Sequence, residues 1–199
     1  MDGPSARLVD TVVDLIARDG LDAVSIRRVA TAAGVSIGAV QHHFPTKDAL
    51  LAAAMDRIET AFVEHLAGQL GDGTRPGQAL RAVAHELVPV DGEARAGTVV
   101  WTWFVARAMV DEPTADRHRR SWRALEDVLA RLLAAHHGTD PADQAPADAA
   151  AGLLALLDGL SLAAATEPGR MPPDRAARLI DEHVDRLLEP SAPSTAVSR

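Results

Sequence analysis

Apolar residues recur every three or four positions through almost the whole chain, and no segment alternates polar and apolar residues as a half-buried strand does. Leu8, Val12, Leu15 and Ile16 begin this pattern. Ala and Leu, which favour helices, are abundant. Tyr is absent and runs of β-branched residues are few, which disfavours sheets. The sequence therefore predicts an all-α fold of about nine helices.

Capping residues and glycine or proline breaks divide the pattern into separate helices. The expected helices cover residues 5–19, 26–33, 37–44, 46–70, 77–88, 92–110, 114–137, 146–166 and 173–188. We expect an N-terminal domain over residues 1–48 and a second helical domain over 49–189, with helix 46–70 linking them. Residues 190–199 contain two prolines and are expected to form a disordered tail.

Composition excludes several classes of protein. The chain has no cysteine, which excludes disulfides, thiolate metal sites and cysteine nucleophiles. Its first residues are polar, and no apolar run approaches the roughly 18 residues that a membrane span needs. The eight histidines are scattered, and no phosphate loop or G-x-S-x-G elbow occurs. We therefore expect a cytoplasmic protein that is not an enzyme, with no membrane partner, cofactor or metal.

Two short helices joined by a tight turn form the strongest functional signal. Ser25 and Ser36 are good N-caps for these helices, and Gly34 suits the sharp turn between them. A helix, a glycine turn and a second short helix is the helix-turn-helix arrangement, which places one helix in the DNA major groove. The pattern alone is also compatible with a small helical hairpin of no such function.

Charge placement favours the DNA-binding interpretation. The chain carries a net charge of -8, yet residues 23–47 contain no Asp or Glu. The same segment holds Arg27, Arg28 and Lys47, and it includes His42 and His43. A local acid-free, cationic segment in an acidic chain is the electrostatic pattern expected of a DNA-contacting face.

The sequence SIRRVATAAGVSIGAVQHHFPTKDALL at residues 25–51 resembles the N-terminal domain of TetR/AcrR-family transcriptional regulators. The AGVS turn, the HF pair and the Lys-acid-x-Leu-Leu start of the next helix all sit at the spacing of that family. The close match spans roughly residues 8–55, and beyond residue 70 the similarity is one of architecture. The resemblance implies a protein that binds double-stranded operator DNA.

The resemblance also implies roles for individual residues. Ser25, Ser36, His43 and Lys47 match positions that contact phosphate, where helix N-termini also attract anions. Arg27 matches a position that reaches a base edge.

Gln41 stands where the family usually has Tyr, so it contacts either an adenine edge or a phosphate. His42 occupies a variable position that faces the groove. Arg28 is either a further contact or a solvated surface residue.

The remaining candidates on the reading helix carry no hydrogen-bonding side chain. Ile37 and Ala39 offer apolar contact, for example to thymine methyl groups, and Gly38 allows close approach of the helix. Because few residues can donate to bases, we expect part of the sequence specificity to come from DNA shape.

The second domain concentrates the aromatic residues. Four of the six aromatic side chains of the chain lie between residues 101 and 122. This concentration predicts the wall of a cavity of a few hundred Å³ for a small-molecule effector, the kind of ligand that the family resemblance implies. For each residue taken alone we favour ordinary core packing, and the cavity hypothesis concerns the cluster as a whole. The candidate cavity residues are Trp101, Phe104, Val105, Met109, Trp122 and Asp158.

Asp158 is unusual because it interrupts an apolar helix. It caps a neighbouring helix, pairs with an Arg or contacts a polar ligand, and we favour a structural role. The acidic residues and tryptophans would suit a cationic ligand.

The helix near residues 146–166 is apolar almost all round, which predicts burial on two sides. With the helix near 173–188 it would form a four-helix interface in a homodimer, as the resemblance implies. A two-fold dimer presents two reading helices to successive grooves about 34 Å apart.

We expect a ligand-responsive regulator, a repressor released from its operator when an effector shifts the population of conformers. The alternative is a helix-turn-helix regulator without small-molecule input, controlled by a protein partner or by abundance.

Overall fold

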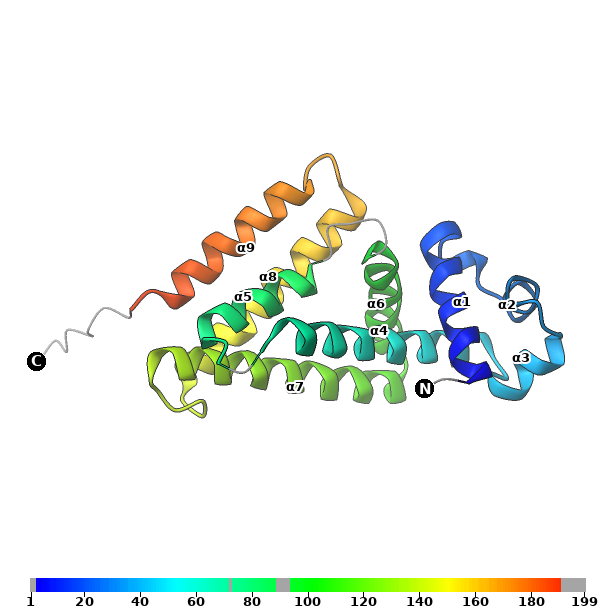
Figure 1. The fold of residues 1–199 in the computed structure, drawn as a ribbon, viewed down its shortest axis with the longest axis horizontal. Coiled ribbons are helices and arrows are strands. Elements are labelled where there is room, and N and C mark those ends of the chain that lie inside the picture. Colours follow the sequence, from blue (N-terminus) through cyan, green and yellow to red (C-terminus); the bar gives the residue numbers. More distant parts are fainter. Residues whose placement is uncertain (1–2, 72, 89–93, 191–199) are drawn as a thin grey trace, which may run out of the picture.

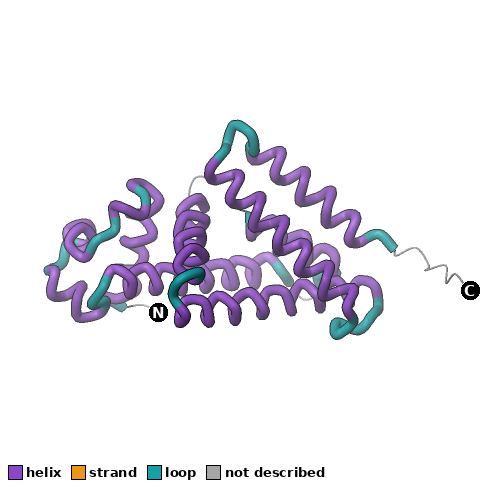
Figure 2. Tube along the Cα trace, turned by 180° about the vertical axis from the view of Figure 1, so that it is seen from behind, coloured by secondary structure: helices purple, strands orange, loops and turns teal. Residues whose placement is uncertain are grey.

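The structure is a computed structural model that describes residues 3–71, 73–88 and 94–190. Within these ranges the chain forms nine α-helices and one 3₁₀ turn at Leu21–Ala23, with no strand (Figures 1 and 2). The predicted all-α fold is confirmed. The helices are α1 (Pro4–Asp19), α2 (Ile26–Ala33), α3 (Ile37–His43), α4 (Lys47–Gln69), α5 (Pro76–Leu87), α6 (Ala94–Ala108), α7 (Glu112–His137), α8 (Gln144–Thr166) and α9 (Pro173–Leu188).

Helices α1, α2 and α3 form a small lobe at one end of the molecule (Figure 1). Its core is built from side chains at helical spacing, among them Val12 and Ile16 of α1, Val29 of α2 and Val40 of α3. All four are fully or almost fully buried. Each such side chain stabilises the fold by about 1.5 to 3 kcal/mol relative to an exposed position.

Helix α4 links this lobe to the rest of the protein (Figure 1). Its start is fixed by Thr46, whose hydroxyl accepts a hydrogen bond from the Ala49 amide at 3.0 Å. Leu50 and Leu51 near its start belong to the core of the lobe, whereas Phe62 further along packs against a second core. A single helix therefore carries contacts to both halves of the molecule.

The second core lies between α5, α7, α8 and α9, and α8 contributes most to it. Helix α8 is long and apolar enough to cross a membrane by length and composition alone. Its leucines Leu153, Leu154, Leu157 and Leu160 are nevertheless buried against the neighbouring helices. A core helix of a globular protein passes the same test, so this is weak evidence for a membrane span.

Helix α6 stands between the two cores. Val100 and Phe104 are buried in the core of the α1–α3 lobe, together with Leu51 and Met55 of α4. That core therefore extends beyond residue 48, the expected end of the first domain. The expected disordered tail lies outside the described residues except for Pro190.

Candidate DNA-binding surface and effector cavity

The turn between α2 and α3 is fixed by local hydrogen bonds. Ser25 accepts from the Arg28 amide at 3.2 Å, and Ser36 accepts from the Ala39 amide at 3.1 Å, so each serine caps its helix. Gly34 adopts a left-handed conformation with φ of 67°, and the Val35 amide donates back to the Ala30 carbonyl at 2.9 Å. These bonds give two short helices a defined relative orientation.

Helix α3 presents most of its surface to solvent, because Val40 is its single buried residue. The predicted contact residues are distributed accordingly. Ser25 and Lys47 are partly buried, and the others are exposed, namely Arg27, Arg28, Ser36, Ile37, Gly38, Ala39, Gln41, His42 and His43. No predicted DNA contact is buried, and an exposed apolar Ile37 on a short polar helix is consistent with a surface that meets a partner.

Two of the cationic side chains have partners within the lobe. Arg28 forms an ion pair with Asp19 at 2.7 Å, which satisfies part of its charge. Lys47 donates from Nζ to the Leu21 carbonyl at 3.2 Å and so ties the start of α4 to the segment after α1. Arg27 is exposed and has no ion pair among the described residues. Its placement suits a base contact better than that of Arg28.

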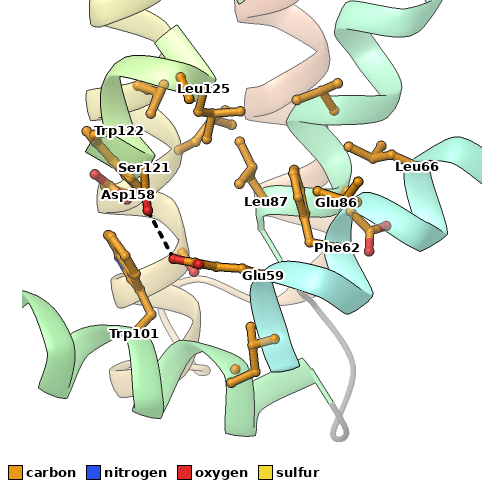
Figure 3. A pocket seen from close by; sticks show the side chains of 18 of the residues that line it. Glu59, Phe62, Leu66, Glu86, Leu87, Trp101, Ser121, Trp122, Leu125 and Asp158 are labelled. Atoms are coloured by element: carbon orange, nitrogen blue, oxygen red, sulfur yellow. Dashed lines mark hydrogen bonds between the residues drawn. The ribbon is translucent and has the colours of Figure 1, made fainter. Parts of the chain in front are cut away.

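A cavity of about 530 Å³ lies between α4, α5, α6, α7 and α8 (Figure 3). Its wall is mostly apolar, with side chains such as Phe62, Leu66, Leu87 and Leu125. The polar residues on the wall are few: Glu59, Glu86, Thr98, Ser121, Asp158 and Ser161. An apolar cavity with a few polar groups is the usual form of a small-molecule site.

Two tryptophans stack in the wall of this cavity. The rings of Trp101 and Trp122 lie 4.2 Å apart with an angle of 11° between their planes. His118 packs beside both, with centroid distances of 5.2 and 5.3 Å. Burial, and then the neighbouring Arg119, lower the pKa of His118, which keeps this imidazole neutral at pH 7. Trp101 and Trp122 line the cavity and offer aromatic faces to a ligand, whereas His118 packs beside them and is not among the lining residues.

Asp158 lies on the cavity wall near Trp122 and Ser121 (Figure 3). Burial raises its pKa from 3.8 to about 6, although hydrogen bonding from the Trp101 side chain acts in the opposite direction. No ion pair of Asp158 occurs among the described residues, and no helix cap involves it. The hydrogen bond from Trp101 agrees with the structural role favoured from the sequence, and the position on the wall also allows contact with a ligand.

The two glutamates of the cavity wall, Glu59 and Glu86, each have a polar side chain as a partner. Glu59 accepts from Arg117 at 2.8 Å and from the Ser121 hydroxyl at 3.2 Å (Figure 3, dashed line). Glu86 lies 3.5 Å from the imidazole of His65. Among the described residues, Asp158 is therefore the acidic residue of the wall that has no Arg or His partner.

The structure brings together half of the predicted cavity residues. Trp101, Trp122 and Asp158 line the cavity, whereas Phe104, Val105 and Met109 are not among its lining residues. Phe104 is 3% exposed and is buried in the core of the α1–α3 lobe, because α6 packs against α1 and α4 there. Met109 lies beyond the last residue of α6 and is 82% exposed. Those three assignments were wrong.

The wall residues on α4 and α5 were not identified from the sequence. The signal was present in α4, where Met55, Ile58, Phe62, Val63 and Leu66 occupy more than one face of the helix. A helix with such a broad apolar surface has more than one apolar neighbour.

Comparisons with known proteins agree with this arrangement. Residues 8–54 match the family model described as bacterial regulatory proteins of the tetR family. Residues 76–189 match the model of the C-terminal part of BetI-type transcriptional repressors.

Similar proteins span nearly the whole chain. The regulator BetI of Burkholderia thailandensis is 31% identical over 197 residues, covering 94% of both chains. The regulator PksA of Bacillus subtilis is 30% identical over 179 residues, covering 87% of this chain and 84% of the relative.

Among solved structures, a transcriptional regulator from a Rhodococcus species has a TM-score of 0.81 with 32% identity, covering 94% of this chain and 96% of its own. A transcriptional regulator from Saccharomonospora viridis, solved in complex with choline, shares the fold with a TM-score of 0.81 at 21% identity, covering 91% and 95%. Such proteins regulate transcription and are not enzymes. The chain therefore belongs to the TetR family of DNA-binding transcriptional regulators, with a C-terminal domain of the BetI-type repressors.

Proposed function

We propose that this chain is a homodimeric, cytoplasmic repressor that leaves its operator when a small molecule enters the cavity between α4 and α8. The observation that carries the proposal is the position of α4. Its first turns are buried in the DNA-binding lobe, and Glu59, Phe62 and Leu66 further along line the cavity. An effector that prefers one position of α4 changes the fraction of molecules with operator-competent geometry.

The chemistry of the wall favours an organic cation with an apolar body. Trp101 and Trp122 offer aromatic faces for cation–π contact, and Asp158 offers a carboxylate with no ion-pair partner among the described residues. The side chains of Phe62, Leu66 and their neighbours suit an apolar group. The choline complex of the Saccharomonospora viridis regulator supports a cation of this kind in a related fold.

The outer face of α8 supports a two-fold interface. Small residues recur along it at helical spacing and are exposed, namely Ala151, Gly152, Ala155 and Gly159, and Leu162 continues the face with 47% exposure. A Cβ atom added at Gly152 or Gly159 would meet nothing within 4 Å. Small side chains allow close approach of a second α8, which is the isologous geometry expected of a dimer.

An interface charge tests the dimer. Ala155→Arg would place a charge at the centre of the α8 face and is expected to convert the dimer to monomers in sedimentation velocity. Asp22→Arg, at an exposed position of the 3₁₀ turn in the α1–α3 lobe and away from α8, serves as the control. A dimer that survives Ala155→Arg would place the interface elsewhere.

A titration tests the effector. An operator duplex is first selected from a random-sequence library, and its affinity is measured by fluorescence anisotropy. Choline, benzyltrimethylammonium and the uncharged isostere of choline, in which carbon replaces nitrogen, are then added. The two cations are expected to quench tryptophan fluorescence and release the duplex, and the isostere is expected to do neither.

The competing candidate is a regulator controlled by a protein partner or by its abundance. It predicts that none of the three compounds changes tryptophan fluorescence or operator affinity.

A further inference from the structure

One arginine of α7 connects the wall of the cavity to the core of the DNA-binding lobe. Arg117 donates to Glu59 at 2.8 Å, and it also pairs with Asp56, which precedes Glu59 by about one turn of α4. Burial lowers the pKa of Arg117, but the hydrogen bonds to Asp56 and Glu59 outweigh that effect and raise it. The guanidinium therefore stays charged and fastens α7 to the middle of α4.

The same guanidinium lies over an aromatic ring of the other core. The Arg117 carbon Cζ is 5.4 Å from the centroid of the Phe104 ring, a cation–π distance. Phe104 is 3% exposed and packs with residues of α1 and the first turns of α4. A shift of Arg117 therefore changes its ion pairs with α4. It also changes its contact with the Phe104 ring, which fills the core of the DNA-binding lobe.

Glu59 faces the place where the ligand would bind. In Figure 3 its carboxylate points toward Ser121 and Trp101, on the side of the cavity where Trp122 and Asp158 also lie. Two carboxylates, Asp56 and Glu59, share the single positive charge of Arg117. This group carries one net negative charge when both are ionised, so a cation beside the tryptophans is attracted to Glu59 and competes with Arg117 for it.

We propose that the Arg117–Glu59 pair holds α4 in the operator-competent position. A bound cation then releases the operator by pairing with Glu59 in place of Arg117. The second step rests on the proposed function. Arg117 is then a positioning residue, since it need not touch either DNA or ligand. The pair also explains why a cation would act where an uncharged molecule of the same shape would not.

The first test needs no ligand. Operator affinity of the full-length protein is measured for Arg117→Gln, for Glu59→Gln and for the double variant. Each single change is expected to weaken operator binding by about fivefold or more, and the double variant by no more than either single change. Singles that bind the operator as tightly as wild type would overturn the proposal, and so would losses that simply add.

A matched control separates this role from general destabilisation. Arg119, two positions further along α7, pairs with Glu112 and Asp116 of its own helix and makes no ion pair to α4 among the described residues. Arg119→Gln is expected to retain wild-type operator affinity. Arg117→Lys keeps the charge and is expected to recover part of the operator affinity. Such a recovery would show that the loss in Arg117→Gln does not arise because the fold tolerates no change at this site.

The second test uses benzyltrimethylammonium. The ratio of operator Kd with and without this probe is expected to fall toward one in Arg117→Gln. Tryptophan quenching is expected to show that the probe binds this variant at least as tightly as wild type, because Arg117 no longer competes for Glu59. If the ratio of operator Kd values in Arg117→Gln equals that of wild type, the proposed role of the Arg117–Glu59 pair is refuted. If the probe fails to bind wild type, the proposed effector class is wrong, and the ligand-free test still decides the role of Arg117.

Discussion

Replacing Asp158 by Asn tests whether the negative charge of this side chain destabilises the folded protein and contributes to ligand binding. The carboxylate has a pKa raised from 3.8 to about 6 by burial. Each tenfold change in proton affinity corresponds to about 1.4 kcal/mol, so the ionised side chain costs the folded state about 3 kcal/mol at pH 7. Asp158→Asn is therefore expected to be more stable than wild type by up to about 3 kcal/mol, or roughly 6 to 10 °C in Tm.

The sign follows from proton binding. Between pH 3.8 and about 6 the folded protein holds a proton on Asp158 that the unfolded chain has lost, so wild-type stability falls as pH rises through this window. The Asn variant lacks this dependence. The difference between the two proteins should be near zero below pH 3.8 and complete above about pH 6.

The assay is urea unfolding followed by circular dichroism at a series of pH values, at one fixed protein concentration because a dimer unfolds in a concentration-dependent way. Asp22→Asn, at an exposed position in the α1–α3 lobe, is the control and should change little. The variant should also bind benzyltrimethylammonium at least about tenfold more weakly, equivalent to about 1.4 kcal/mol. Equal stability of wild type and Asp158→Asn at every pH would refute the reasoning.

Four further predictions concern the DNA-binding lobe. Arg27→Ala is expected to reduce the free-energy difference between binding to operator and to mismatched DNA by about 1 to 3 kcal/mol. Unchanged binding curves for both duplexes would show that Arg27 does not contact a base. Lys47→Ala should weaken binding to all sequences and lower the slope of log K against log salt by about 1.8, because the dimer carries two Lys47 residues and each phosphate contact contributes about 0.9. An unaltered slope together with reduced stability would show that Lys47 acts only through its hydrogen bond to Leu21. Gly38→Ala is expected to stabilise α3 by about 0.5 to 1 kcal/mol yet to weaken operator binding. Gly34 adopts a φ of 67°, so Gly34→Ala should destabilise the fold by about 1 to 2 kcal/mol. Chemical denaturation and anisotropy titrations on the same samples separate these effects, and tighter operator binding by Gly38→Ala would contradict close approach of α3.

Local features of the fold could be predicted because they depend on neighbouring residues. Ser25 and Ser36 cap their helices as expected, and Thr46 caps α4 in the same way, since a cap needs only a short polar side chain and an amide three positions later. The expected helix 114–137 begins two residues too late, because Asp111 caps α7 by accepting from the Thr114 amide at 3.1 Å. Asp-Glu-Pro is compatible with both a turn and a helix start, so the sequence did not separate them.

The cavity could be predicted only in part because it depends on how distant helices pack. Trp101 and Phe104 lie three residues apart on α6 and both pack against the core of the α1–α3 lobe, yet only Trp101 also lines the cavity. Which of the two side chains reaches the cavity depends on how α6 packs against α4, α7 and α8, and no local pattern specifies that packing. The pair of Arg117 with Glu59 joins residues 58 positions apart, and neither side chain was singled out from the sequence. Charge pairs of this kind become visible only once α4 and α7 are side by side.

Calorimetric titration of the dimer with benzyltrimethylammonium, alone and saturated with its selected operator duplex, tests most directly whether the cavity controls DNA binding. Linkage requires the operator to weaken probe binding by the same factor by which the probe weakens operator binding, expected to be about tenfold. Equal probe affinity with and without the operator would contradict the account.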